Sequence, residues 1–93
     1  MILRDGDKLS VQGPVTIGTV VAVIAQGVAL FDRDDLVIDL AQVSEVDSSA
    51  VSMLLEWQRE ADRSKRKLRF TNMPKNLQSL ARLYGVSELI PLA

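Results

Sequence analysis

Apolar and polar side chains alternate along residues 8–12, a pattern that predicts a half-buried β-strand. Ile2-Leu3 is a candidate partner strand across a short glycine-containing turn, and Gly13-Pro14 is expected to end the first strand. Residues 36–40 form a nearly continuous apolar run, as is typical of a central strand covered on both faces. Alternation returns at residues 67–71 and predicts a further strand.

In the segments between these strands, apolar side chains recur at helical spacing and predict helices. Thr16 is a candidate cap for a helix that runs to about Leu30. Residues 48–64 place their apolar side chains on one broad helical face, with Met53 and Trp57 at its margin.

A third helix is expected after Pro74, because apolar side chains then recur at helical spacing and Gly85 is well placed to end the helix. The members of this stripe, which we expect to lie in the core, are Leu77, Leu80, Ala81 and Tyr84. Strands that alternate with helices predict an α/β fold, with a mixed sheet of about four to five strands and helices packed on it. We expect residues 1–93 to form a single domain.

The composition excludes several kinds of catalytic site. The chain has 93 residues, is 47% hydrophobic, and contains neither cysteine nor histidine. Thiol catalysis, Ser-His-Asp catalysis and Cys- or His-ligated metals are therefore excluded, and we expect no metal or cofactor. An enzyme that uses carboxylates remains open, but a binding or regulatory module is the simpler expectation.

Charge bears on partners and location. Eleven basic and twelve acidic residues give a net charge of −1, which argues against a nucleic-acid-binding protein. The most apolar stretch, Val20 to Phe31, is about a dozen residues long, whereas a membrane span needs roughly 20. The first residues do not resemble a signal peptide, so a cytoplasmic location is expected.

The charges are unevenly distributed along the chain. Residues 1–47 hold three basic and eight acidic side chains, and residues 48–93 hold eight basic and four acidic ones. The basic excess between Arg59 and Arg69 fits a solvated helix end, where cations favour the negative end of the dipole. It also fits a surface that approaches phospholipid headgroups or an acidic partner.

The segment Asp47-Ser48-Ser49 lies where the second helix is expected to begin. Asp47 is suited to cap the helix by accepting hydrogen bonds from free backbone amides. Capping alone would explain the tripeptide, but a helix N-terminus would also accommodate a phosphate on a serine. A nucleophilic serine is disfavoured, because the chain has no histidine to activate it.

Three segments resemble the signature of STAS domains, a family that includes bacterial anti-sigma factor antagonists. They are the strand at residues 36–40, Val46-Asp47-Ser48-Ser49-Ala50, and Met53-Leu54-Leu55. Gly13-Pro14-Val15-Thr16 and the segment from Asn76 to Val86 look most like the MlaB-like branch, the STAS subunit of the Mla phospholipid-transport ABC system. The resemblance covers essentially the whole chain.

Each branch implies a different function. The MlaB-like branch implies a non-catalytic cytoplasmic subunit, peripheral to the inner membrane, in a transporter that maintains outer-membrane lipid asymmetry. Such a subunit binds and supports the ABC ATPase and, through it, the inner-membrane permease, with Ser48 at the ATPase contact. The antagonist branch implies phosphorylation of Ser49 by a partner anti-sigma factor kinase. Antagonists typically have glycine where Ala50 stands, and this departure weakens the case for phosphorylation without removing it, since Ser49 itself is present. The ending Leu83-Tyr84-Gly85-Val86 favours the MlaB-like branch.

We therefore expect a partner-binding surface at the start of the second helix. Met and Trp are enriched at interface hot spots, and Arg82, on the polar flank of the third helix, could pair with a carboxylate. The residues assigned to this surface are Ser48, Ser49, Ser52, Met53, Trp57 and Arg82.

Overall fold

Four strands form one mixed sheet with the order β1-β2-β3-β4. The strands are β1 (Ile2–Asp5), β2 (Lys8–Val15), β3 (Asp35–Val46) and β4 (Lys67–Thr71). β1 and β2 form an antiparallel hairpin, whereas β2, β3 and β4 run parallel to one another. The structure is a computed structural model, and it describes residues 1–92.

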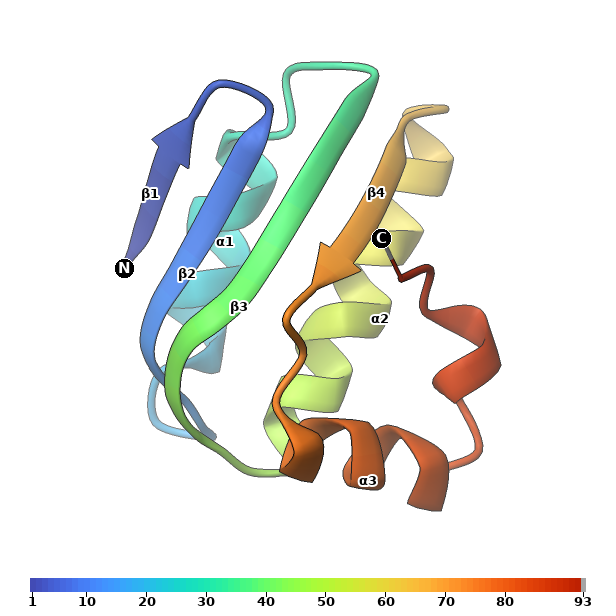
Figure 1. Cartoon of the computed structure of the whole chain (residues 1–93). Coiled ribbons are helices and arrows are strands. Elements are labelled where there is room, and N and C mark those ends of the chain that lie inside the picture. The colour runs from blue at the N-terminus through green and yellow to red at the C-terminus, as the bar shows by residue number, and fades with distance from the viewer. Residues whose placement is uncertain (93) are drawn as a thin grey trace.

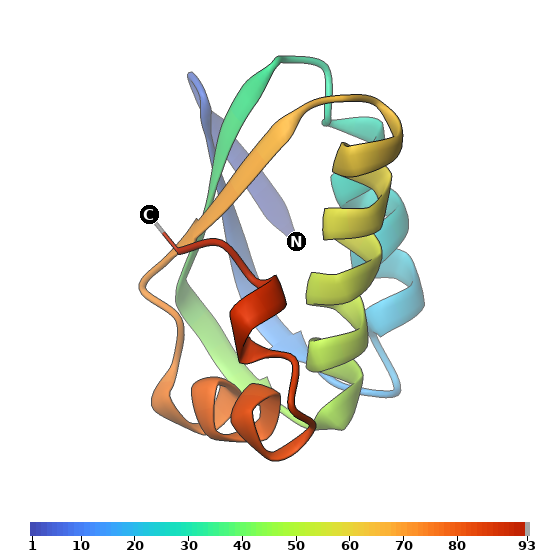
Figure 2. The same cartoon turned by 90° about the vertical axis from the view of Figure 1, so that its right-hand side faces the viewer.

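Two crossover helices cover the same face of this sheet. α1 (Val20–Ala29) joins β2 to β3, and α2 (Ser48–Arg63) joins β3 to β4. Because both crossovers step across the sheet in the same direction with the same hand, they place α1 and α2 in one layer (Figures 1 and 2). Within residues 1–92, the opposite face of the sheet carries no helix. The predicted α/β fold with a mixed sheet is confirmed.

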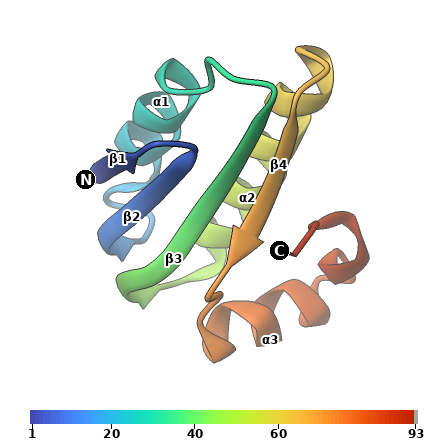
Figure 3. The same ribbon diagram turned by 45° about the horizontal axis from the view of Figure 1, so that its top comes forward.

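The C-terminal part of the chain closes one end of the two layers. α3 (Lys75–Leu83) lies beyond the carboxyl end of β4 (Figure 3), and the short 3-10 helix η1 (Ser87–Leu89) follows it. Leu92 then forms a parallel bridge with Phe70, so the chain returns to the edge of β4.

The core lies between the sheet and the two crossover helices. Trp57 is its largest side chain and is fully buried. Its indole N–H donates to the carbonyl of Ile24 in α1 at 3.1 Å, and its ring meets Phe31 edge to face. Gly27 of α1 lies directly against the indole, so the two helices approach closely because this position has no side chain.

Two strands are longer than predicted. β2 continues through Gly13-Pro14 to Val15. Proline is tolerated there because β1 pairs with β2 only as far as Val11, and a shift of register against β3 falls between Gly13 and Pro14. β3 continues to Val46, because its second half pairs with this extension of β2 although several of its side chains are exposed.

The first helix begins later than predicted. The carbonyl of Thr16 accepts from the amides of Thr19 and Val20, which makes a turn before α1 begins at Val20. Thr16 therefore does not cap the helix. The Thr19 hydroxyl accepts from the Thr16 amide at 3.0 Å and donates to the Pro14 carbonyl at 2.9 Å.

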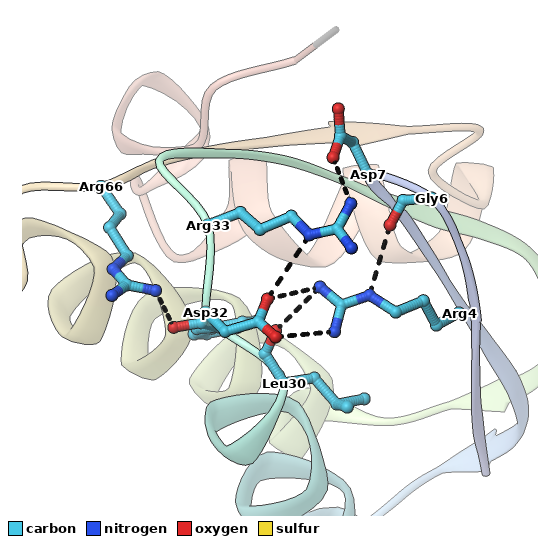
Figure 4. A network of polar contacts seen from close by, with 8 residues as sticks. Arg4, Gly6, Asp7, Leu30, Asp32, Arg33 and Arg66 are labelled. Atoms are coloured by element: carbon cyan, nitrogen blue, oxygen red, sulfur yellow. Dashed lines mark hydrogen bonds and ion pairs between the residues drawn. The ribbon is translucent and has the colours of Figure 1, made fainter.

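Charged side chains bind the loops together at the end of the sheet where β1 turns into β2 (Figure 4). Arg4 pairs with Asp32 at 2.7 Å, and Arg33 pairs with Asp7 at 2.7 Å. Arg66 donates to the carbonyl of Phe31. The pKa of the Asp32 carboxyl is lowered, chiefly by its hydrogen bonds from Arg4.

The contact between Gly27 and Trp57 predicts an unusual response to alanine. In a helix interior, Gly→Ala normally stabilises by about 0.5–1 kcal/mol. Here a Cβ would lie 2.6 Å from the indole nitrogen, so Gly27→Ala should instead lower the free energy of unfolding by about 1–3 kcal/mol in urea titrations. Gly18→Ala is the control, because a Cβ there meets only the Thr16 hydroxyl at 3.9 Å. Equal stabilities for the two variants would contradict this packing.

Candidate functional site

The carboxyl ends of β2 and β3 bring the starts of α1 and α2 to one end of the molecule. Val15 and Val46, the last residues of the two strands, are partners in the parallel ladder. The loop that enters α1 therefore lies beside the first turn of α2. In open parallel sheets, binding sites form preferentially outside these carboxyl ends.

Asp47 joins the two loops at this point. It occupies the N-cap position of α2, and its carboxylate accepts from the Ser49 amide at 2.8 Å, which is the capping geometry that the sequence predicts. Its second oxygen accepts from the amide of Ile17, in the loop before α1, at 2.9 Å. One carboxylate thus fixes the start of α2 and the entry to α1 relative to each other.

These hydrogen bonds favour the charged form of the carboxylate. The pKa of Asp47 is lowered, chiefly by the hydrogen bond from the Ile17 amide and further by those from Ser49. The carboxylate is committed to backbone donors in its ionised form, which suits a structural clamp rather than a proton donor.

The three predicted serines line one shallow groove. It has a volume of about 370 Å³ and lies between the first two turns of α2 and the segment that follows α3. Ser48 and Ser52 are exposed, and Ser49 is half-buried. The remaining lining residues are Val51, Leu55, Tyr84 and Val86.

The groove lining carries hydroxyl groups and apolar side chains but no charge. Such a surface offers hydrogen-bonding groups and area for burial, as the core of a protein interface does. It lacks a base that could activate a serine. The chemistry of the groove therefore favours the binding of a partner over catalysis by a serine.

Met53 and Trp57 do not belong to this surface. The prediction that they lie at the margin of the apolar face, open to a partner, is wrong, because both side chains are fully buried. The buried sector of α2 is wider than its own periodicity indicates, since α1 covers one flank of the helix while the sheet covers another. Their burial makes both residues part of the core that supports the groove.

Tyr84 is a functional candidate that the sequence placed in the core. Leu77 and Ala81 are buried as predicted and Leu80 is half-buried, but Tyr84 is 55% exposed. The helix ends at Leu83, and the chain turns at Gly85 with a positive φ, which leaves Tyr84 at the rim of the groove. The sequence does contain a signal for this exposure: Tyr84 directly precedes Gly85, the glycine that is predicted to end the helix.

Arg82 lies apart from the serine groove. It is exposed and lines a separate hollow of about 200 Å³ between α3 and the C-terminal segment. Its guanidinium makes no ion pair or hydrogen bond with residues 1–92. The structure thus unites Ser48, Ser49 and Ser52 and places Arg82 beside another hollow.

Asp39 is a buried carboxylate whose hydrogen-bonding partners lie within the fold. Asp39 accepts from the Ala41 amide at 2.9 Å and from the Asn72 side chain at 3.1 Å, and it pairs with Lys8 at 3.1 Å. The pKa of Asp39 is lowered, chiefly by the Ala41 amide. These partners satisfy the Asp39 carboxylate, so its role is structural.

Comparisons with known proteins agree with this architecture. A family model described as Mlab, STAS domain matches residues 2–91. The unphosphorylated anti-sigma factor antagonist SpoIIAA has a similar structure, with a TM-score of 0.74 at 16% identity over 100% of this chain and 86% of its own. The crystal structure of a protein described as Mglu matches with a TM-score of 0.62 at 22% identity, over 81% of this chain and 19% of its own.

No curated protein matches the sequence. Within residues 1–92, none of the helices has the length and apolar character needed to cross a membrane.

The Asp47 clamp predicts a specific acid dependence of stability. Because its pKa is lower in the folded state, the carboxylate contributes stability above its unfolded pKa of about 3.9, and this contribution disappears as the pH falls through the folded pKa. Asp47→Asn should be less stable at pH 7 and lose stability less steeply below pH 4 in urea titrations. Asp47→Ser keeps an uncharged cap and should show the same shallower acid dependence. A slope identical to that of the wild type in both variants would contradict the clamp.

Proposed function

Because the chain belongs to the MlaB-type family of STAS domains, we propose that it is a non-catalytic subunit of an ABC-type phospholipid transporter. Its partner is the cytoplasmic ATPase of that transporter, which it binds and supports, and through which it associates with the inner-membrane permease. In this role the protein is cytoplasmic, peripheral to the inner membrane, and contributes to outer-membrane lipid asymmetry.

The observation that carries this proposal is the uncharged groove at the start of α2. Ser48 and Ser52 are exposed at its edge, and Leu55 and Tyr84 add apolar area that a partner can bury. No charged side chain interrupts this lining. Such a surface suits a stable subunit contact, because no ionised group of the lining has to be removed from water when the partner binds.

A second candidate function is that of an anti-sigma factor antagonist controlled by phosphorylation of Ser49. The structural likeness to SpoIIAA favours it at the level of the fold. Two observations weigh against it: Ser49 is only half-exposed, and the family model that matches is the MlaB type. Genes that encode an ABC ATPase and permease beside this gene would support the transporter role, whereas a serine kinase and a sigma factor would support the antagonist role.

A large cation at Ser48 should disrupt binding to the ATPase. Ser48→Arg leaves the exposed side chain free to extend into water, so the fold should survive, but in the complex the guanidinium would be desolvated without a partner. We expect at least about a tenfold loss of affinity in isothermal titration calorimetry with the transporter ATPase.

Ser64→Arg is the matched control, because it makes the same change at an exposed serine beyond the other end of α2. Ser52→Arg, one turn further along the groove, should behave like Ser48→Arg. If both groove variants bind as the wild type does while remaining folded, the groove is not the ATPase contact.

A negative charge at Ser49 separates the two candidate functions. The helix dipole tolerates an acidic group in the first turn, so Ser49→Asp should remain folded. Under the transporter function this variant should lose the ATPase, whereas the neutral Ser49→Asn should retain more binding. Mass spectrometry should find no phosphate on Ser49 in cells; a phosphorylated population that changes with a kinase, and no ATPase in a pull-down, would establish the antagonist function instead.

A further inference from the structure

The outward face of α1 is exposed and almost entirely apolar. Ile17, just before the helix, and Val21, in its first turn, are each 79% exposed. Ala22, Ala25 and Ala29 continue the exposed face along the helix, and Gln26 is its single polar member. The opposite side of α1 packs against the sheet and α2 through Val20, Val23 and Gly27. A helix that is apolar on all sides is typical of a buried position.

Charge is also missing from this face. The sequence contains no charged residue between Lys8 and Asp32, and α1 has neither an acidic first turn nor a basic last turn. The outer side of α2 is different, since Glu56 pairs with Arg59 and Glu60 pairs with Arg63. The two helices lie in the same layer (Figure 2). The exposed side of α2 carries charged side chains, and that of α1 does not.

One hydrogen bond places the beginning of the apolar face beside the start of α2, where the serine groove begins. The Ile17 amide donates to the Asp47 carboxylate at 2.9 Å, and the same carboxylate caps the helix that carries Ser48 and Ser49. The clamp therefore holds an exposed Ile17 beside the start of α2. A protein bound over the start of α2 would therefore be close to the exposed Ile17 side chain.

We propose that the ATPase of the proposed transporter covers the outward face of α1 as well as the groove, with an apolar segment that carries no charged side chain. This inference rests on the proposed function. The absence of charge on α1 indicates what kind of partner segment fits it. An ionised side chain placed against α1 would lose its water and find no counter-charge, so the segment should be uncharged. The apolar face thus extends the contact from the hydroxyl-lined groove to Ile17, Val21 and Ala25.

A second copy of this chain fits the face less well. α1 has 10 residues and is therefore about 15 Å long, so two such faces would bury little area. Stable interfaces bury about 1,200–2,000 Å² in total. Ile17, however, lies beside the start of α2, so a partner that covers the groove can also reach the α1 face, and this favours the same partner for both.

The test places one lysine at the centre of the face. Ala25→Lys keeps a good helix former at an exposed position, so the fold should be retained. In calorimetry with the ATPase, it should weaken binding by at least about tenfold, because the ammonium would be buried without a partner. Val21→Ser removes apolar area without adding charge and should weaken binding by a smaller factor. Ala41→Lys is the matched control, since it makes the same change at an exposed alanine of β3, outside α1 and the groove.

Each other outcome overturns the inference. If Ala25→Lys binds as the wild type does while Ser48→Arg does not, the ATPase contacts the groove alone and the proposed function stands. If the wild type does not bind the ATPase, the proposed function fails, and this inference fails with it. If Ala25→Lys abolishes self-association measured by sedimentation, or binding to anionic phospholipid vesicles, without changing ATPase affinity, then a second copy or a lipid surface occupies the face.

Discussion

The carboxylate of Asp47 is the constraint on which the functional end of this molecule depends. Parallel pairing of β2 with β3 brings two loops together at Val15 and Val46, but the ladder ends there, so the amides of Ile17 and Ser49 lie beyond it. Asp47 supplies the missing acceptors by binding the Ile17 amide with one oxygen and the Ser49 amide with the other. The groove and the apolar face of α1 consequently have a fixed relation to each other.

Most of the fold follows from patterns that the sequence displays. The strand at residues 67–71 is observed with those bounds, and α2 ends within one residue of its predicted limit. The errors occur where pairing between distant segments overrides local signals. Gly13-Pro14 would end an isolated strand, but the short β1 leaves that edge of β2 unpaired, so proline costs no ladder hydrogen bond to β1.

The site was predicted less completely because it depends on which helix lies beside which. A single helix pattern places Trp57 at a margin, yet the absence of a side chain at Gly27 lets α1 approach and bury it. The residue pattern of α1 or α2 alone does not predict that the two helices pack against each other at Gly27 and Trp57. The role of Ile17 is not predictable from the sequence for a related reason, since it rests on a backbone amide whose partner lies 30 residues away. By contrast, the helix cap at Asp47 is predictable because capping depends on residues close in sequence.

Ion pairs and the uncharged groove lie at opposite ends of the sheet, and this separation bears on both candidate functions. The arginine–aspartate pairs gather at the end where β1 turns into β2, whereas the groove at the other end has an uncharged lining. Binding in the groove must rely on burial and neutral hydrogen bonds, which salt screens little. The same neutrality makes the surface sensitive to one added phosphate, because its roughly −1.5 to −2 charges would meet no cation in the groove. A permanent subunit contact and a phosphorylation switch therefore call for the same surface, and what separates them is whether the partner supplies the cations.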